Sequence, residues 1–226
     1  MKTMKLFFVS LICIMTFNAN AQTQTHTLQE FDEVKVLDQI NVTLIKSSEN
    51  KAVVSGEEAG DVKIENNSGK LKVHMELDDF LGGNENNVKL YYSGELEMVE
   101  AKQGATINSD DTVETSYLVV NSRAGSNVDL TIDTRNLEIK VVSGGDLTVS
   151  GNATDLEVTV RSGGDYHGEE LDSERATVSV FAGGGAKISA DEYIDASVTA
   201  GGTIEIYGSP EEVITDETFG GTITEM

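Results

Sequence analysis

Residues 143–165 read SGGDLTVSGNATDLEVTVRSGGD, so this segment begins and ends with the same tetrapeptide, SGGD. A small residue followed by one or two glycines, or a close variant of that pattern, recurs along the second half of the chain. The first glycine of each copy is Gly104, Gly125, Gly144, Gly163, Gly183, Gly201 or Gly220. The spacings between these glycines are 21, 19, 19, 20, 18 and 19 residues, a regularity that indicates a repeat architecture.

Segments in which apolar and polar residues alternate lie on both sides of the glycines. Residues 156–160, LEVTV, lead into one copy, and residues 146–149, DLTV, follow another. Alternation in Val, Ile and Thr with a period of two predicts strands that bury one face. A unit of about 19 residues is too short to close its own core, so each strand must pair with its equivalent in the next unit. The sequence therefore predicts a parallel β-solenoid whose coils stack ~4.8 Å apart.

The glycines mark the corner at which each coil bends. Such a corner requires a positive φ or a close approach of neighbouring corners, and a Cβ atom obstructs both. A β-sandwich is the alternative fold, because it also has short strands at regular spacing. We prefer the solenoid, since turn chemistry varies along a sandwich whereas one chemistry recurs here at one phase.

Residues 22–95 do not follow this period. They contain alternating segments joined by polar turns, such as NNSG at residues 66–69, and predict an irregular β segment that caps the first coil. The coils are predicted to occupy residues 96–226, in one continuous domain with the N-terminal segment. Residues 78–87, DDFLGGNENN, are the loop expected to be most mobile.

Residues 1–21 have the features of an export signal. Lys2 and Lys5 precede an apolar run at residues 6–17, which is followed by the triplet Ala-Asn-Ala ending at Ala21. The run is too short to span a bilayer. Cleavage after Ala21 would also remove Cys13, the single cysteine, and would exclude disulfides and thiol chemistry from the mature protein. We expect export to the periplasm, the outer surface or the medium.

The acidic composition limits the classes of partner. The chain has 39 acidic and 16 basic residues, and loss of Lys2 and Lys5 would change the formal net charge from -23 to -25. A nucleic acid or an anionic membrane would be repelled, whereas cations and cationic partners are attracted at long range. The simplest role of this charge is to keep the surface soluble. No second apolar segment is long enough for a membrane span.

Three further stretches carry a family resemblance. They are FDEVKVLDQINVTLIKS at residues 31–47, GKLKV at residues 69–73 and coils that close with GSP at residues 208–210. Together with the export signal, this combination resembles the putative auto-transporter adhesin, head GIN domain family from about Phe31 to the C-terminus. The resemblance implies a right-handed parallel β-helix similar in shape to pectin lyases, exported by Bacteroidetes-like bacteria, with a role in cell adhesion. The family defines no catalytic residues to match.

Polysaccharide-cleaving β-helices use clustered carboxylates, often with calcium, and a basic residue. Asp146 and Asp165 follow the glycines at equivalent positions, so we expect them on one face of adjacent coils, with Arg161 just before the turn. The simpler interpretation is that each aspartate caps its turn by accepting a backbone N–H. We expect no catalytic residue, metal site or cofactor, and calcium at the two aspartates is the alternative.

Aromatic side chains can stack on sugar rings, so exposed tyrosines are candidate contacts. Alternation predicts that Tyr207 points outward, and Tyr91 or Tyr92 are further candidates. An ordinary strand tyrosine is the simpler interpretation of each. Tyr166 takes the inward position that Leu147 holds one coil earlier, which predicts a core residue.

Two functions fit these observations. The first is a non-enzymatic, exported β-helix whose polar faces bind a glycan, a matrix protein or another envelope component. The second is a polysaccharide-active lyase or hydrolase on the same fold, which the fold alone does not exclude. Coils of 18 to 21 residues leave little chain to wall a substrate cleft, and this favours the non-enzymatic function. Homo-oligomerisation through the last coil is a third prediction.

Overall fold

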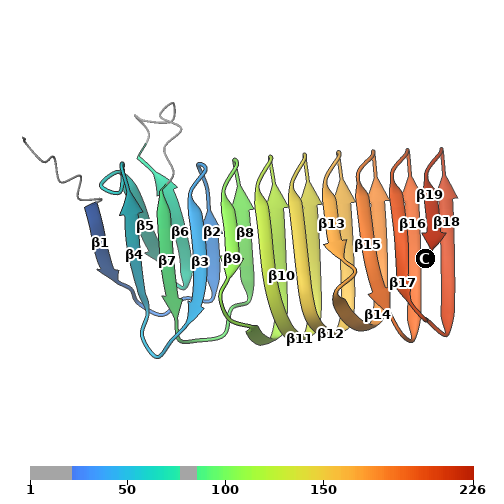
Figure 1. Ribbon diagram of the computed structural model, residues 1–226, viewed down its shortest axis with the longest axis horizontal. Helices are drawn as coiled ribbons and strands as arrows, with labels where there is room; N and C mark the ends of the chain where they lie inside the picture. The colour runs from blue at the N-terminus through green and yellow to red at the C-terminus, as the bar shows by residue number, and fades with distance from the viewer. Residues whose placement is uncertain (1–21, 77–85) are drawn as a thin grey trace, which may run out of the picture.

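The computed structural model describes residues 22–76 and 86–226, and in this part of the chain all regular structure is β-strand. Nineteen strands form one continuous hydrogen-bonded sheet that winds into a two-sided rod (Figure 1). Strands of successive coils pair in parallel, which confirms the solenoid and shows that the sandwich alternative is wrong. The predicted export signal and most of the predicted mobile loop lie outside the described residues.

The strands that lead into the glycine turns form one side of the rod, which we call the leading face. The strands that leave the turns form the opposite side, the trailing face. The leading face comprises β5 (Val62–Asn67), β6 (Lys70–Met75), β2 (Glu33–Val36), β8 (Met98–Lys102), β10 (Val113–Arg123), the second halves of β11 (Asn127–Val142) and β12 (Asp146–Arg161), β14 (Leu171–Phe181), β16 (Tyr193–Thr199) and β18 (Glu212–Thr218).

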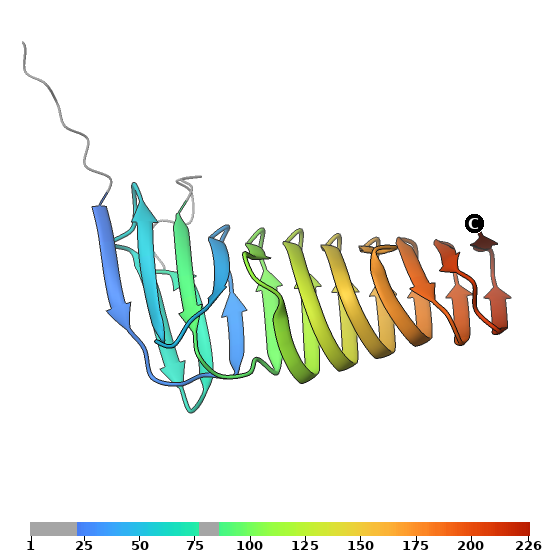
Figure 2. The same ribbon diagram turned by 60° about the horizontal axis from the view of Figure 1, so that its bottom comes forward.

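The trailing face comprises β1 (Gln22–Thr27), β4 (Lys51–Gly56), β7 (Asn87–Tyr92), β3 (Asn41–Lys46), β9 (Thr106–Ser109), the first halves of β11 and β12, β13 (Asp165–Gly168), β15 (Gly185–Ala190), β17 (Thr203–Gly208) and β19 (Thr222–Glu225). Figure 2 shows the coils stacked side by side along the rod. The core lies between the two faces, and every second residue is buried within each half of β11. Tyr166 is completely buried beside Leu147, as predicted.

Each glycine turn reverses the chain with two consecutive residues at positive φ. Ser162 and Gly163 have φ values of 55° and 73°, and the other six turns repeat this pair. In the last three turns the next residue, Gly184, Gly202 or Gly221, also has a positive φ. Consecutive positive φ values are those of a type I′ turn, which favours glycine at its second central position. A Cβ atom built on Gly163 would meet no other atom within 4 Å. The requirement at this position is therefore conformational and not steric.

The close approach of the preceding coil limits the size of the residue after the turn. A Cβ on Gly164 would lie 2.8 Å from Cγ1 of Val141 in the preceding coil, so the valine side chain occupies the space that the glycine leaves. Earlier coils differ. At Gly145 the equivalent of the valine is Ser122, whose backbone oxygen would lie 2.5 Å from the added Cβ. One coil before that, Ser126 takes the position of the glycine, and the equivalent of the valine is Ala101, whose carbonyl accepts a 2.8 Å hydrogen bond from the Ser126 hydroxyl. The Val141–Gly164 and Ala101–Ser126 pairs are thus complementary in size.

The N-terminal segment contributes coils that the glycine spacing does not reveal. Strands β2 and β3 are joined by a turn at Asp38 and Gln39, which have φ values of 60° and 59° without any glycine. This coil pairs in parallel with β8 and β9 on one side and with β6 and β7 on the other. Strands β1, β4 and β5 pair antiparallel to their neighbours and cap the rod. The stack therefore continues past residue 96 toward the N-terminus, with its strands out of sequence order.

The last coil has polar residues at the inward phase. Glu217 is in register with the buried Val198, and Glu225 with the buried Ile206. One carboxylate oxygen of Glu217 accepts a 2.8 Å hydrogen bond from the backbone N–H of Ile223, which joins β18 to β19 across the end of the core. Inward charges on an edge strand oppose the addition of another strand.

The size match between Gly164 and Val141 predicts a compensating pair of substitutions. Gly164→Ser should lower the free energy of unfolding by about 1–3 kcal/mol, because its Cβ meets Val141. In a Val141→Ala background the same change should cost less, because that combination reproduces Ala101 and Ser126. Gly163→Ala is the comparison, since it adds only backbone strain. Chemical denaturation of the four variants measures the coupling, and equal costs of Gly164→Ser in both backgrounds would refute the size match.

The inward carboxylates of the last coil oppose the homo-oligomerisation that the sequence alone suggests, and they predict a monomer. Replacing Glu217 and Glu225 by valine should cause concentration-dependent association, because it removes the charges that oppose strand addition at the open edge. Asp216→Val is the control, since Asp216 lies at the outward phase of the same strand. Light scattering after size-exclusion chromatography gives the mass of each variant. An associated wild-type protein would contradict this prediction.

Candidate binding groove

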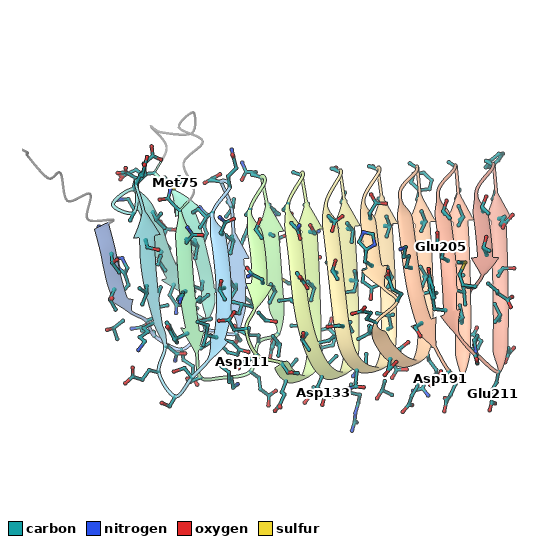
Figure 3. The ribbon with its side chains drawn as sticks, in the orientation of Figure 1. Met75, Asp111, Asp133, Asp191, Glu205 and Glu211 are labelled. Carbon is teal, nitrogen blue, oxygen red and sulfur yellow. The ribbon has the colours of Figure 1, made fainter. Side chains whose placement is uncertain are left out.

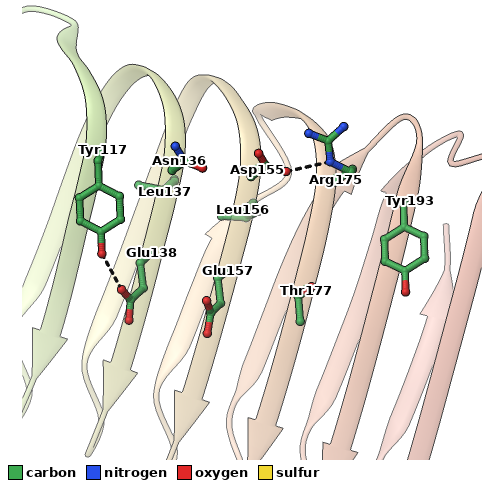
Figure 4. Close-up of a pocket in the computed structure, with 10 residues that line it drawn as sticks. All are labelled: Tyr117, Asn136, Leu137, Glu138, Asp155, Leu156, Glu157, Arg175, Thr177 and Tyr193. Carbon is green, nitrogen blue, oxygen red and sulfur yellow. Dashed lines mark hydrogen bonds and ion pairs between the residues drawn. The ribbon is translucent and has the colours of Figure 1, made fainter.

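A shallow groove of about 600 Å³ lies on the outer side of the leading face. It crosses β10, β11, β12, β14 and β16, and Figure 4 shows the residues that line it. We call it the tyrosine groove, because a tyrosine lies at either end. Its principal polar and aromatic residues are Tyr117, Glu138, Asp155, Glu157, Arg175 and Tyr193.

Strand register arranges these residues in rows along the rod. Tyr117, Asn136, Asp155, Arg175 and Tyr193 occupy equivalent positions of five successive coils. Four coil steps therefore separate the two tyrosines, a distance of ~19 Å at the spacing of paired strands. The exposed fraction of Tyr117 is 46%, so one side of its ring is open to solvent.

A second row runs beside the first, toward the glycine turns. Glu138, Glu157 and Thr177 are in register with one another, two residues further along their strands than the first row. Side chains at positions i and i+2 of a strand lie on the same side of the sheet. Both rows therefore face outward, and they form the floor and rims of the groove.

Hydrogen bonds link the tyrosine at one end to the carboxylates. The Tyr117 hydroxyl donates a 3.0 Å hydrogen bond to Glu138, which also accepts from Lys140. The Lys140 ammonium holds the pKa of Glu138 below its ordinary value. The same hydrogen bond to Glu138 raises the pKa of Tyr117. Glu138 is therefore an ionised acceptor at neutral pH.

Arg175 is the basic residue among those lining the groove. Its Nε donates a 2.8 Å hydrogen bond to Asp155, and a terminal nitrogen donates a 3.1 Å hydrogen bond to Glu192. These carboxylates raise the pKa of Arg175, so its charge persists at all physiological pH values. The groove has one guanidinium group and three carboxylates, those of Glu138, Asp155 and Glu157. It therefore presents mainly hydrogen-bond acceptors to a ligand.

The predicted aspartate pair lies elsewhere, on the trailing face. Asp146 and Asp165 are in register on β12 and β13, so the structure brings them together as neighbours. His167 Nε2 lies 3.4 Å from an Asp146 carboxylate oxygen. Arg161 does not join them. It lies on the leading face beside Phe181, because the two turn residues that follow it reverse the chain.

The other predicted contacts are also divided between the faces and the core. Tyr207 lies on the trailing face and donates a 2.9 Å hydrogen bond to Glu205. Tyr92, a candidate contact from the sequence, is 2% exposed, and this interpretation of it is wrong because the inward phase of β7 places its ring in the core. Lys51 Nζ lies 4.8 Å from the ring centre of Tyr91 and covers it.

Carboxylates also follow the edge of the rod opposite the glycine turns. Figure 3 shows Asp111, Asp133, Asp191 and Glu211 along this edge. Within residues 22–76 and 86–226, no group of three or more His, Cys, Asp or Glu residues is placed to hold a metal ion. Calcium binding at Asp146 and Asp165 stays a prediction. The same part of the chain contains no helix long and apolar enough to cross a membrane.

Sequence reasoning missed both tyrosines of the groove. Tyr117 and Tyr193 are 76 residues apart, which is four coils of 19 residues, so their common phase was available as a signal. The alternation around Tyr117 is weak, since residues 113–117 read VETSY. Its outward direction becomes evident only from the pairing of β10 with β11.

Comparison with known proteins places the chain in a family. A family model described as putative auto-transporter adhesin, head GIN domain matches residues 30–210. No curated protein matches. The fold is similar to that of a putative adhesin from Bacteroides fragilis, with a TM-score of 0.83 and 18% identity over 92% of this chain and 98% of that chain.

Two further crystal structures share the fold. A putative adhesin from Parabacteroides merdae has a TM-score of 0.70 and 18% identity over 92% of this chain and 97% of that chain. A putative lipid binding protein from Parabacteroides distasonis has a TM-score of 0.67 and 16% identity over 92% of this chain and 98% of that chain. The family match covers most of the sequence, and the chain belongs to the putative auto-transporter adhesin, head GIN domain family.

Proposed function

We propose that this protein is a non-enzymatic, exported binding module that holds a glycan of the matrix or cell envelope on its leading face. The tyrosine groove is the observation that carries this proposal. Two aromatic rings lie in one row, and amide, carboxylate and guanidinium groups lie between them. The family description as an adhesin and the similar putative adhesin structures support an exported, adhesive role.

The chemistry of the groove suits a carbohydrate chain. A tyrosine ring has an apolar face that packs on the C–H face of a sugar and a hydroxyl that remains hydrated. Carboxylate and amide oxygens accept hydrogen bonds from sugar hydroxyls. The groove follows the rod axis for ~19 Å between Tyr117 and Tyr193, and it is open along its length. A linear polymer can therefore enter it from the side.

A polysaccharide-cleaving enzyme is the alternative that the sequence left open. Glu138 and Glu157 are neighbours in register, and glycosidases use two closely placed carboxyl groups. One of them must carry a proton, which requires a raised pKa. The pKa of Glu138 is lowered, because Lys140 and Tyr117 stabilise its charged form. Glu138 is therefore not the proton donor of such a pair.

Loss of either end of the groove should weaken glycan binding. Tyr117→Ala and Tyr193→Ala should each raise the Kd by about fivefold, equivalent to ~1 kcal/mol of lost stacking. Tyr207→Ala is the matched control, because Tyr207 lies on the trailing face. A glycan array of the mature chain identifies the ligand, and calorimetry measures the three variants.

The array and the variants test different parts of this function. If Tyr117→Ala and Tyr207→Ala lowered the affinity for the glycan equally, the groove would not be the binding site. Depolymerisation of a bound polysaccharide, detected as new reducing ends, would establish the enzymatic alternative instead. An absence of binding to every glycan on the array would contradict the proposed function.

The hydrogen bond between Tyr117 and Glu138 predicts a pH dependence. A Glu138→Gln substitution should lower the pKa of Tyr117 toward its ordinary value, because the negative charge that opposes ionisation of the phenol is lost. NMR titration of tyrosine ring carbons measures this pKa, with Tyr207 as the internal reference. An unchanged pKa would show that the two groups do not interact in solution.

A further inference from the structure

A concentration of basic residues lies beside the tyrosine groove on the same face. Lys35 Nζ and Lys102 Nζ lie 3.2 Å and 3.1 Å from the carboxylate of Glu100, and Arg123 Nε lies 3.6 Å from it. We call Lys35, Lys102 and Arg123 the basic patch. Three positive charges surround one negative charge, so the patch has an excess of two positive charges in a strongly acidic protein.

Strand register places a further lysine on either side of the basic patch. Lys72 lies beside Lys35 on β6, and Lys140 lies beyond Asn121 on β11. Carboxylates also face these flanking lysines, since Glu65 is in register with Lys72 and Glu138 pairs with Lys140. The excess positive charge is therefore concentrated at the basic patch itself.

The basic patch contains more donors than Glu100 can use. Glu100 is 8% exposed and its pKa is lowered, because the hydrogen bonds from Lys102 and Lys35 outweigh the effect of burial. The Nε atom of Arg123 is buried and has no hydrogen-bond acceptor in the described structure. The side chains of Lys35 and Arg123 are both accessible from solvent, with exposed fractions of 40% and 39%. The exposed parts of the Lys35 and Arg123 side chains can accommodate an additional anion.

We propose that the basic patch binds an anionic substituent of the glycan, a sulfate, phosphate or carboxylate group. This rests on the proposed function in that it takes the ligand to be a glycan. Glu138 in the groove and Lys140 in the row of the patch lie two residues apart on β11, on the same side of the sheet. The patch lies nearer the glycine turns than the row of Tyr117, so a chain that crosses the coils obliquely can place a neutral part in the groove and a charged substituent at the patch.

A polysaccharide fits this patch better than an anionic membrane does. A bilayer surface is flat and would approach the acidic residues around the patch together with the patch itself. Membrane binding also draws on apolar side chains that enter the interface. Among the described residues, the exposed large apolar side chains lie outside the patch, at Tyr117, Phe181, Ile214, Phe219 and Met226. A glycan chain is narrow enough to contact the patch alone.

The net charge predicts an unusual salt dependence. At low ionic strength the charge of the whole molecule repels an anionic polymer. At 0.15 M salt the Debye length is ~8 Å, so the distant carboxylates are screened while contacts at the patch persist. At 1 M salt the contacts at the patch weaken as well. Binding of a sulfated polymer should therefore be strongest at intermediate salt.

The test compares dextran sulfate with unmodified dextran of the same length, using the mature chain. Wild type should prefer dextran sulfate. Lys35→Gln should weaken binding of dextran sulfate by about two- to fivefold, because one exposed charge contact is lost. Glu100→Gln should strengthen it, because the neutral isostere leaves all three bases free for the ligand. Lys187→Gln on the trailing face is the control and should change nothing.

Each outcome separates this inference from the function on which it rests. Groove-dependent binding of a glycan with no preference for sulfate would overturn the anionic site and leave the proposed function intact. Unchanged binding by both Lys35→Gln and Glu100→Gln, with thermal melts showing folded protein, would also overturn it. Vesicles containing phosphatidylglycerol form the last arm. Binding to them without binding to dextran sulfate would assign the patch to a membrane and refute the glycan ligand.

Discussion

The absence of a Cβ after the turn lets neighbouring coils stack at the spacing of paired strands at the glycine edge. A Cβ on Gly164, Gly202 or Gly221 would first meet Cγ1 of a valine in the preceding coil, and one on Gly184 would first meet the backbone oxygen of Gly164. The two residues of the turn itself have positive φ, which brings the chain from one face to the other without a loop. Because the coils then repeat with nearly constant length, their strands stay in register and the two faces remain regular.

Regular register turns the chain into rows of side chains along the rod. Residues that are about 19 positions apart become neighbours at the spacing of paired strands. The tyrosine groove and the basic patch both arise in this way, and they share β10 on the leading face, which carries Tyr117 and Arg123. Other carboxylates, among them Asp111, Asp133, Asp191 and Glu211, line the edge opposite the glycine turns (Figure 3). An acidic protein thereby obtains one face with a distinct charge pattern.

The two ends of the rod are closed by different means. At the N-terminal end, β1, β4 and β5 run antiparallel to their neighbours and interrupt the parallel stack. At the C-terminal end, Glu217 turns toward the core phase and bonds to the backbone of β19. A solenoid needs such ends, since its interior coils pair equally well on both sides. The excess of inward polar groups at the last coil follows from this requirement.

Local chemistry in the sequence determined the coils. The period of the glycines, the alternation of Val, Ile and Thr and the inward phase of Tyr166 follow from backbone φ preferences and strand geometry, which act over a few residues. Tertiary structure alone decided the rest. It revealed the coil with Asp38 and Gln39 at its turn, the distance of Arg161 from Asp146 and Asp165, and the meeting of Tyr117 with Glu138. Each of these depends on which strands pair across long separations, and pairing is set by the packing of the whole core.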